Sequence, residues 1–92
     1  MPNCFNIGKY HVYFWLNEGE PMEKFHVHIS EGKPTSNATK IWITSDGRCV
    51  LCHNKSRIPK NKLRDYMEII ENNIPMIKEQ WISRFGEITY IS

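Results

Sequence analysis

The sequence predicts an α+β fold: an antiparallel β-meander of four to five strands, with two C-terminal helices packed on one face. Two patterns lead to this prediction. Across residues 5–53, short stretches alternate apolar with polar side chains, and clusters of turn-forming residues separate them. Across residues 59–86, apolar residues instead recur at the intervals of an amphipathic helix. A chain of 92 residues is expected to form one domain, spanning residues 1–92.

Five strand segments are predicted, at residues 5–7, 10–16, 25–30, 38–44 and 48–53. The first two are joined by Gly8-Lys9, which suits a two-residue hairpin turn that needs glycine at its first position. Asp46-Gly47 favours a second hairpin turn between the last two segments. Pro21 excludes a regular strand from the loop 17–24, and the turn formers of residues 31–37 predict another loop.

Two helices are predicted after the strands. Pro59 suits the first position of a helix, where its missing N–H removes no hydrogen bond. Asn73 is predicted to cap the second helix, and Gly86 to end it. The side chains expected to face the sheet are Leu63, Tyr66, Met67 and Ile70 in the first helix, and Ile74, Ile77, Trp81 and Phe85 in the second. Residues 88–91 are a candidate for a short final strand.

The stretch Phe25-His26-Val27-His28-Ile29 contains the best candidate for a functional site. Its period-two alternation predicts that the three apolar side chains lie beneath the helices. His26 and His28 are then expected to project side by side from the opposite, exposed face of the sheet. Two neighbouring imidazoles on a solvent-exposed strand face are unusual, so this face is the predicted centre of function.

The neighbouring strands are expected to add aromatic and basic side chains to this face. If residues 10–16 pair antiparallel with the central strand, Tyr13 lies opposite His28, and Trp15 lies opposite His26. The complete predicted face consists of Tyr13, Trp15, His26, His28, Lys40 and Trp42. Aromatic rings beside cations suit the stacking of unpaired bases, which predicts nucleic-acid binding. The alternative is that a protein partner covers this face.

The His26 and His28 pair also suits two kinds of chemistry. Side chains at positions i and i+2 of a strand lie about 6.5–7 Å apart, which lets two imidazoles converge on one Zn²⁺. A metal site needs a further ligand, and His11, His53, Glu18, Glu20 and Glu23 are the candidates. Without a metal, the same pair could serve as the acid and base that flank a phosphate. A structural role for both histidines is the remaining alternative.

A basic strip runs from His53 to Arg64. It holds five basic residues and no acidic one: Lys55, Arg57, Lys60, Lys62 and Arg64. The whole chain has twelve basic and ten acidic residues, so the remainder carries a net charge of −3. The strip leads into the start of the first helix, where the N-terminus favours anions. We therefore expect nucleic-acid contacts from Lys55, Arg57, Lys60 and Lys62, against the alternative of a solvated turn and helix start.

The cysteines and the chain start indicate the compartment. Three cysteines make a poor disulfide framework, and no charged and apolar leader follows Met1, so we expect a cytoplasmic protein without a membrane segment. Cys49-Val50-Leu51-Cys52-His53 matches a haem attachment pattern by letter. A strand would turn Cys49 and Cys52 to opposite faces, so we reject haem and expect one buried and one exposed thiol. No cofactor is expected beyond the divalent metal considered above.

Several short motifs are distributed over nearly the whole chain. They are Met1-Pro2, Gly8, Phe14-Trp15-Leu16-Asn17-Glu18-Gly19, His26-Val27-His28, Ala38-Thr39-Lys40-Ile41-Trp42, Asn54-Lys55-Ser56-Arg57-Ile58-Pro59, Trp81 and Phe85-Gly86. Their order and spacing resemble the bacterial DUF4160 family. Many members have two prolines before the paired histidines, where this chain has Lys24-Phe25. The family has no established function. Its genes often stand beside those of another small domain, DUF2442, so the resemblance implies a toxin–antitoxin-like pair.

Three functional hypotheses follow. The first is a cytoplasmic, RNA-binding member of a toxin–antitoxin-like pair, which uses the aromatic face and the basic strip. The second is a protein-interaction module that docks a partner encoded nearby, or a second copy of itself, through the same face. The third is a small hydrolase, either a nuclease with His26 and His28 as catalytic residues or a metal enzyme with the same two side chains as ligands.

Overall fold

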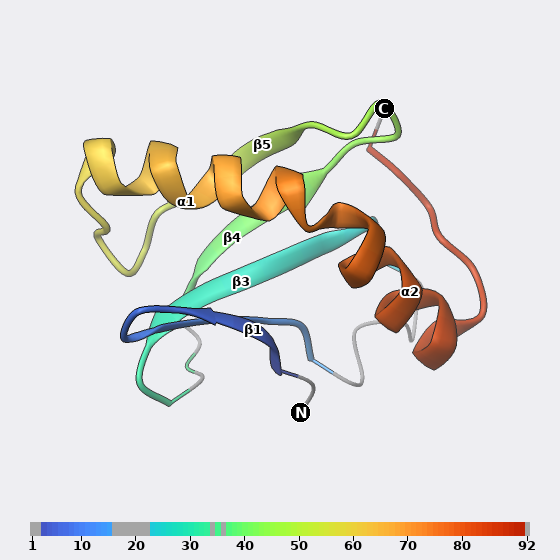
Figure 1. The fold of residues 1–92 in the computed structure, drawn as a ribbon, viewed down its shortest axis with the longest axis horizontal. Coiled ribbons are helices and arrows are strands. Elements are labelled where there is room, and N and C mark those ends of the chain that lie inside the picture. The colour runs from blue at the N-terminus through green and yellow to red at the C-terminus, as the bar shows by residue number, and fades with distance from the viewer. Residues whose placement is uncertain (1–2, 16–22, 34, 36, 92) are drawn as a thin grey trace.

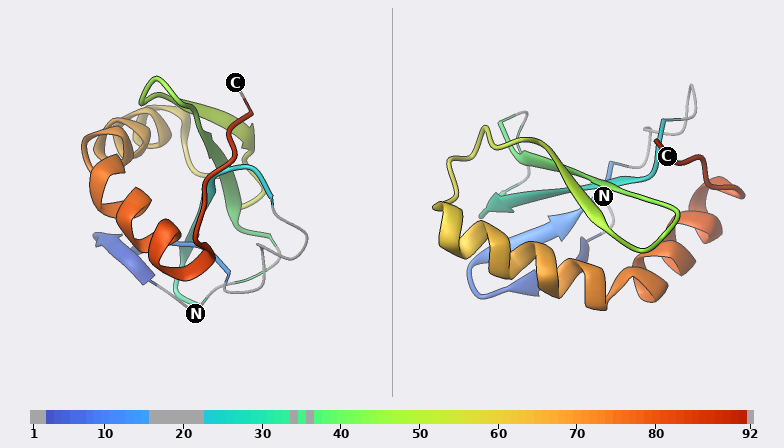
Figure 2. Two further views of the ribbon diagram at one scale, coloured as in Figure 1. Left: turned by 90° about the vertical axis from the view of Figure 1, so that its right-hand side faces the viewer. Right: turned by 90° about the horizontal axis from the view of Figure 1, so that it is seen from above.

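The structure is a computed structural model that describes residues 3–15, 23–33, 35 and 37–91. Its elements are β1 (Asn3–Ile7), β2 (Tyr10–Tyr13), β3 (His26–Glu31), β4 (Thr39–Ile43), β5 (Cys49–His53), α1 (Lys60–Asn72) and α2 (Ile74–Phe85) (Figure 1). The strands form one antiparallel sheet in the order β1-β2-β3-β4-β5. Both helices lie on the same side of this sheet (Figure 2). The predicted α+β meander with two C-terminal helices is therefore confirmed.

The turns and the register agree with the sequence pattern. Gly8 has a φ of 57° in the turn that pairs Ile7 with Tyr10, a conformation that glycine adopts without steric cost. Gly47, with a φ of 82°, closes the hairpin between β4 and β5. Tyr13 pairs with His28 across β2 and β3, as predicted.

The core lies between the sheet and the helices. Its fully buried side chains include Val12, Val27, Ile29, Ile41, Ile43, Ile70 and Ile77. Trp81 of α2 is also fully buried and packs against three phenylalanine rings, with centroids 5.0 Å from Phe14, 5.2 Å from Phe25 and 4.6 Å from Phe85. The apolar members of the central strand thus lie beneath the helices, as their alternation predicts.

Three details of the helical part differ from the sequence prediction. Pro59 is the N-cap residue of α1 and not its first helical residue, and its carbonyl accepts the N–H of Leu63 at 2.8 Å. The Asn73 side chain donates to the carbonyl of Ile69 at 2.8 Å, so it caps the end of α1 instead of the start of α2. The start of α2 has no side-chain cap hydrogen bond.

The C-terminal tail is not a strand, so that prediction is wrong. Residues 87–91 have no regular secondary structure, although the N–H of Phe25 donates to the carbonyl of Thr89 at 2.7 Å. β2 also ends at Tyr13, earlier than predicted, and most of the predicted loop 17–24 lies outside the described residues. Within the described part of the chain, neither helix has both the length and the apolar character needed to cross a bilayer.

Candidate nucleic-acid interface

The structure gathers the predicted aromatic face on the side of the sheet that the helices leave uncovered. The centroid of the His28 ring lies 5.0 Å from that of the His26 ring and 5.5 Å from that of the Tyr13 ring. Two tryptophans extend the cluster. The ring centroids of Trp42 and His26 are 5.7 Å apart, and those of Trp15 and Tyr13 are 5.6 Å apart. These five rings and the ammonium of Lys40 are therefore contiguous, and we call them the aromatic face.

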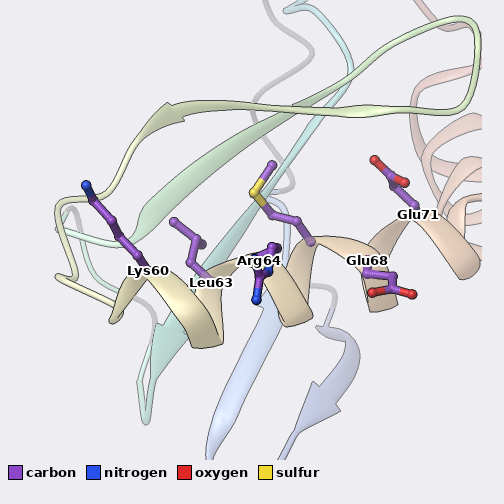
Figure 3. Close-up of a pocket in the computed structure, with 6 residues that line it drawn as sticks. Lys60, Leu63, Arg64, Glu68 and Glu71 are labelled. Carbon is purple, nitrogen blue, oxygen red and sulfur yellow. The ribbon is translucent and has the colours of Figure 1, made fainter.

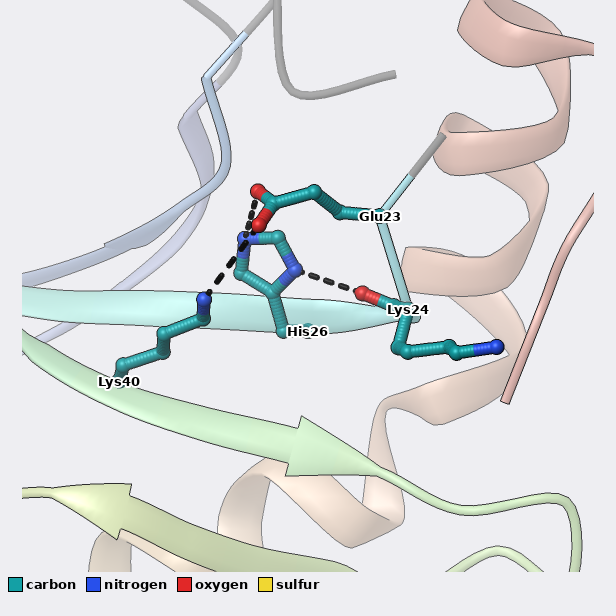
Figure 4. Close-up of polar contacts among 4 residues, drawn as sticks. All are labelled: Glu23, Lys24, His26 and Lys40. Carbon is teal, nitrogen blue, oxygen red and sulfur yellow. Dashed lines mark hydrogen bonds and ion pairs between the residues drawn. The ribbon is translucent and has the colours of Figure 1, made fainter. Parts of the chain in front are cut away.

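His26 is not exposed, so this part of the prediction is wrong. Its side chain is fully buried, and its Nδ1 lies 2.7 Å from the carbonyl oxygen of Lys24 (Figure 4). A carbonyl only accepts hydrogen bonds, so Nδ1 carries the proton and donates. The pairing between β2 and β3 ends at Tyr13 and His28. Beyond it, the ring centroids of Trp81 and His26 lie 5.5 Å apart. His26 is thus packed at the end of the sheet.

Tyr13 is also fully buried, although it lies on the same face. Its ring stacks on His28, and its hydroxyl accepts the backbone N–H of Thr35 at 3.4 Å. A buried ring cannot stack on a base in this conformation. The aromatic rings that reach solvent are those of His28, Trp15 and Trp42, which are partly exposed.

Lys40 is held in place by its neighbours. Its ammonium lies 4.4 Å from the centre of the Trp42 ring and 3.8 Å from a carboxylate oxygen of Glu23, and 17% of its side chain is exposed. Figure 4 shows the Glu23 carboxylate in contact with both Lys40 and His26, with its other oxygen 4.0 Å from His26 Nε2. Lys40 therefore presents a positive charge at a defined position on the aromatic face.

His53 joins this face because of a β-bulge. Ile41 pairs with Leu51, but Lys40 pairs with His53, so Cys52 is an extra residue in β5. The bulge shifts the alternation of β5 by one residue and turns His53 to the side of Lys40. Sequence pattern alone does not place His53 on the aromatic face, because no glycine or other signal in β5 marks the bulge.

The electrostatic surroundings of His53 are cationic. Burial lowers the pKa of His53, and the nearby charges of Lys55, His28 and Lys40 lower it further. Its Nδ1 is buried without a hydrogen-bond partner within the described part of the chain. His53 is therefore the point where the aromatic face and the basic strip meet.

Hydrogen bonds fix the conformation of the loop after β5, which carries Lys55 and Arg57. The amide side chain of Asn54 accepts the N–H of Ile58 at 3.0 Å and donates to the Ile58 carbonyl at 2.8 Å. The hydroxyl of Thr39 in β4 donates to the same amide oxygen at 2.6 Å and contacts the hydroxyl of Ser56. Arg57 has a φ of 58°, and both Lys55 and Arg57 are exposed. These two cations are thus presented by a folded turn.

The rest of the basic strip lies on α1. Lys62 is exposed, and Lys60 lines a groove along α1 on the helix side of the sheet (Figure 3). The structure therefore divides the strip: Lys55 adjoins the aromatic face through His53, whereas Lys60 belongs to another surface.

The predicted metal ligands and the cysteines form no metal site in the described part of the chain. In that part of the chain, no three His, Cys, Asp or Glu side chains are grouped so that they could hold a metal ion. Glu18 and Glu20 lie outside it, so the metal role of His26 and His28 stays a prediction. Cys49 is partly buried, and burial, with Glu71 nearby, raises its pKa to about 12, whereas Cys52 is exposed. The two thiols thus differ in exposure, as predicted.

The fold and this face define a small α+β protein with an aromatic sheet surface that adjoins a basic loop. The chain belongs to the DUF4160 family, a domain of unknown function, whose family model matches residues 10–82. The resemblance drawn from the motifs is thereby confirmed. Neither the curated proteins nor the solved structures contain a match to this chain.

Proposed function

We propose that this protein binds RNA at the junction of the aromatic face and the loop that follows β5. The position of His53 carries the proposal. The Cys52 bulge pairs His53 with Lys40, and His53 also lies close enough to Lys55 and His28 for their charges to lower its pKa. Two features that are separate in the sequence thus adjoin at His53, and the exposed cations beside the aromatic face are suited to contacts with a phosphate backbone.

The exposed rings favour single-stranded RNA over a duplex. Trp15, His28 and Trp42 are partly exposed beside Lys40, and each base stacked on such a ring contributes about 1–3 kcal/mol. Proteins recognise RNA mainly at unpaired loops and ends, where bases are free to stack on side chains. Phosphate contacts from Lys40, Lys55 and Arg57 would accompany this stacking.

The test is the fluorescence anisotropy of a labelled single-stranded RNA of about twelve nucleotides, titrated at two salt concentrations. Three phosphate contacts predict that a rise from about 50 to about 200 mM salt weakens binding roughly twentyfold. Lys55→Ala should weaken binding and reduce the salt dependence. Lys78→Ala, an exposed position on α2, is the matched control and should change neither. Absence of binding at the lower salt, or equal losses in both variants, would contradict the proposal.

The nuclease hypothesis can be tested in the same samples. His26 donates to the carbonyl of Lys24 and is buried, so it would have to leave this bond to reach a phosphate, whereas His28 is partly exposed. This geometry favours RNA binding over cleavage. RNA shortening that is lost in His28→Ala would support the catalytic role of the pair.

The biological setting of the proposal comes from the family resemblance. We place RNA binding in a cytoplasmic protein of a toxin–antitoxin-like pair whose partner is encoded nearby. Co-expression with the neighbouring gene product, followed by mass measurement of the purified sample, tests the pairing separately from RNA binding.

A further inference from the structure

A groove runs along α1 beside β5 and is independent of the aromatic face (Figure 3). Its volume is about 540 Å³, and it is lined by Lys60, Leu63, Arg64, Met67, Glu68 and Glu71. These positions recur every three or four residues, so they form one stripe of the helix. Leu63 and Met67 supply apolar surface, and charged side chains supply the rest.

The charges along this groove change sign at its middle. Lys60 and Arg64 occupy the N-terminal half, and Glu68 and Glu71 occupy the C-terminal half, as Figure 3 shows. If a second α1 lies antiparallel across the groove, Lys60 faces the Glu71 position of the other copy, and Arg64 faces the Glu68 position. A two-fold axis repeats both pairings, so the groove is complementary to itself.

The adjoining strand adds exposed apolar surface. Cys49 donates its thiol proton to the carbonyl of Met67, which places this side of β5 against α1. Leu51 follows Cys49 by two residues, pairs with the core residue Ile41 and is 41% exposed. Leu51 therefore adds to the groove an exposed apolar side chain that a partner seated there would cover. Apolar contact of this kind supplies affinity, and charge complementarity sets orientation.

The outer edge of β5 is only partly covered. The carboxylate of Glu71 accepts the N–H of Cys49 at 3.0 Å, so α1 protects the start of this edge. In an antiparallel ladder, every second residue of an outer strand turns its N–H and C=O outward, which gives Leu51 the same orientation as Cys49. The edge at Leu51 thus lies next to the groove and would be covered together with it.

We propose that a second copy of this chain docks in the α1 groove, antiparallel and related by a two-fold axis. The occupant is inferred from the order of charges, which is complementary to an antiparallel copy of the same helix. Binding of an unrelated partner would not require this self-complementarity. The proposal does not depend on RNA binding, which uses the other side of the sheet.

Charge reversal provides the test, with mass measured by light scattering and sedimentation over a range of concentrations. The wild-type chain should dimerise. Arg64→Glu and Glu68→Arg each place like charges across the axis, so each should raise the dimer dissociation constant at least about tenfold. An equimolar mixture of the two variants restores opposite charges at every contact and should dimerise again. The double variant should do so alone.

Matched controls separate this pairing from net charge. Lys78→Glu and Glu79→Arg change the charge by the same amounts at exposed positions of α2 and should leave the dimer intact. Arg64 and Glu68 are exposed, so all variants should keep the wild-type circular dichroism. A monomeric wild-type chain at every concentration would overturn the proposal. So would single variants that dimerise normally, or a mixture that stays monomeric.

Discussion

The two faces of the sheet are closed by different interactions. On the helix side, Val27 and Ile29 are buried by apolar contact alone. On the other side, His26 and Tyr13 are buried just as completely, but each has a polar partner, the carbonyl of Lys24 for one and the N–H of Thr35 for the other. Buried polar groups need such partners. Alternation along a strand therefore predicts which face a residue occupies but not whether that face is exposed.

The aromatic face is itself divided along the sheet. One end, with His26, is packed against Trp81 and bonded to the chain that enters β3. The other end, with His28 and His53, is partly exposed and adjoins the cations of the following loop. The first end stabilises the fold, and the second is available to a ligand.

Trp81 contacts both faces, so its removal should have the largest effect. Trp81→Ala removes a fully buried indole that packs on Phe14, Phe25 and the ring of His26. Such substitutions lower the free energy of unfolding by about 3–5 kcal/mol, which urea denaturation measures. Ile82→Ala, at a neighbouring side chain that is 42% exposed, is the control and should cost far less. Equal losses would contradict the central position of Trp81 in the core.

The two histidines allow a sharper comparison, because they share one strand and one face but differ in burial. His26→Ala leaves the Lys24 carbonyl without its donor and should lower the free energy of unfolding by about 1–3 kcal/mol. His28→Ala, at a partly exposed ring, should cost less than about 1 kcal/mol and instead weaken RNA binding. Urea denaturation and RNA titration of both variants provide the readouts. A reversed order of stability would mean that the division of the face is wrong.

The smallest expected effect concerns pH. The pKa of His53 is lowered in the folded chain, chiefly by burial, so the unfolded chain binds this proton more readily. The free energy of unfolding should therefore fall as the pH drops below about 6.5, the ordinary pKa of histidine. His53→Gln should make this fall shallower between pH 7 and about 5.5, as followed by urea denaturation. His11→Gln, on β2, is the control, and identical pH dependence in wild type and His53→Gln would contradict the assignment.

Most of the fold could be predicted because its signals are local. The alternation in β3 predicts the faces, and Gly8 and Gly47 mark the hairpin turns. Gly86, with a φ of 85°, ends α2 as its position after the apolar stripe predicts. Each of these signals depends on residues that are close together in the chain.

The candidate site could be predicted only in part because its exposure depends on distant contacts. The burial of His26 depends on Trp81, which is far along the chain and arrives through the packing of α2. The position of His53 depends on a one-residue bulge at Cys52, which shifts the alternation without a characteristic residue. Lys60 and Lys55 are close in sequence, yet the turn between them places Lys60 in the α1 groove.

The backbone conformation of Arg57 carries an energetic cost. Glycine adopts a φ of 58° without steric cost, whereas the same φ costs other residues about 1 kcal/mol or more. The chain tolerates that penalty and keeps a guanidinium at the tip of a turn where a residue without a side chain would fold more easily. A guanidinium held at this energetic cost fits the phosphate contact proposed for Arg57.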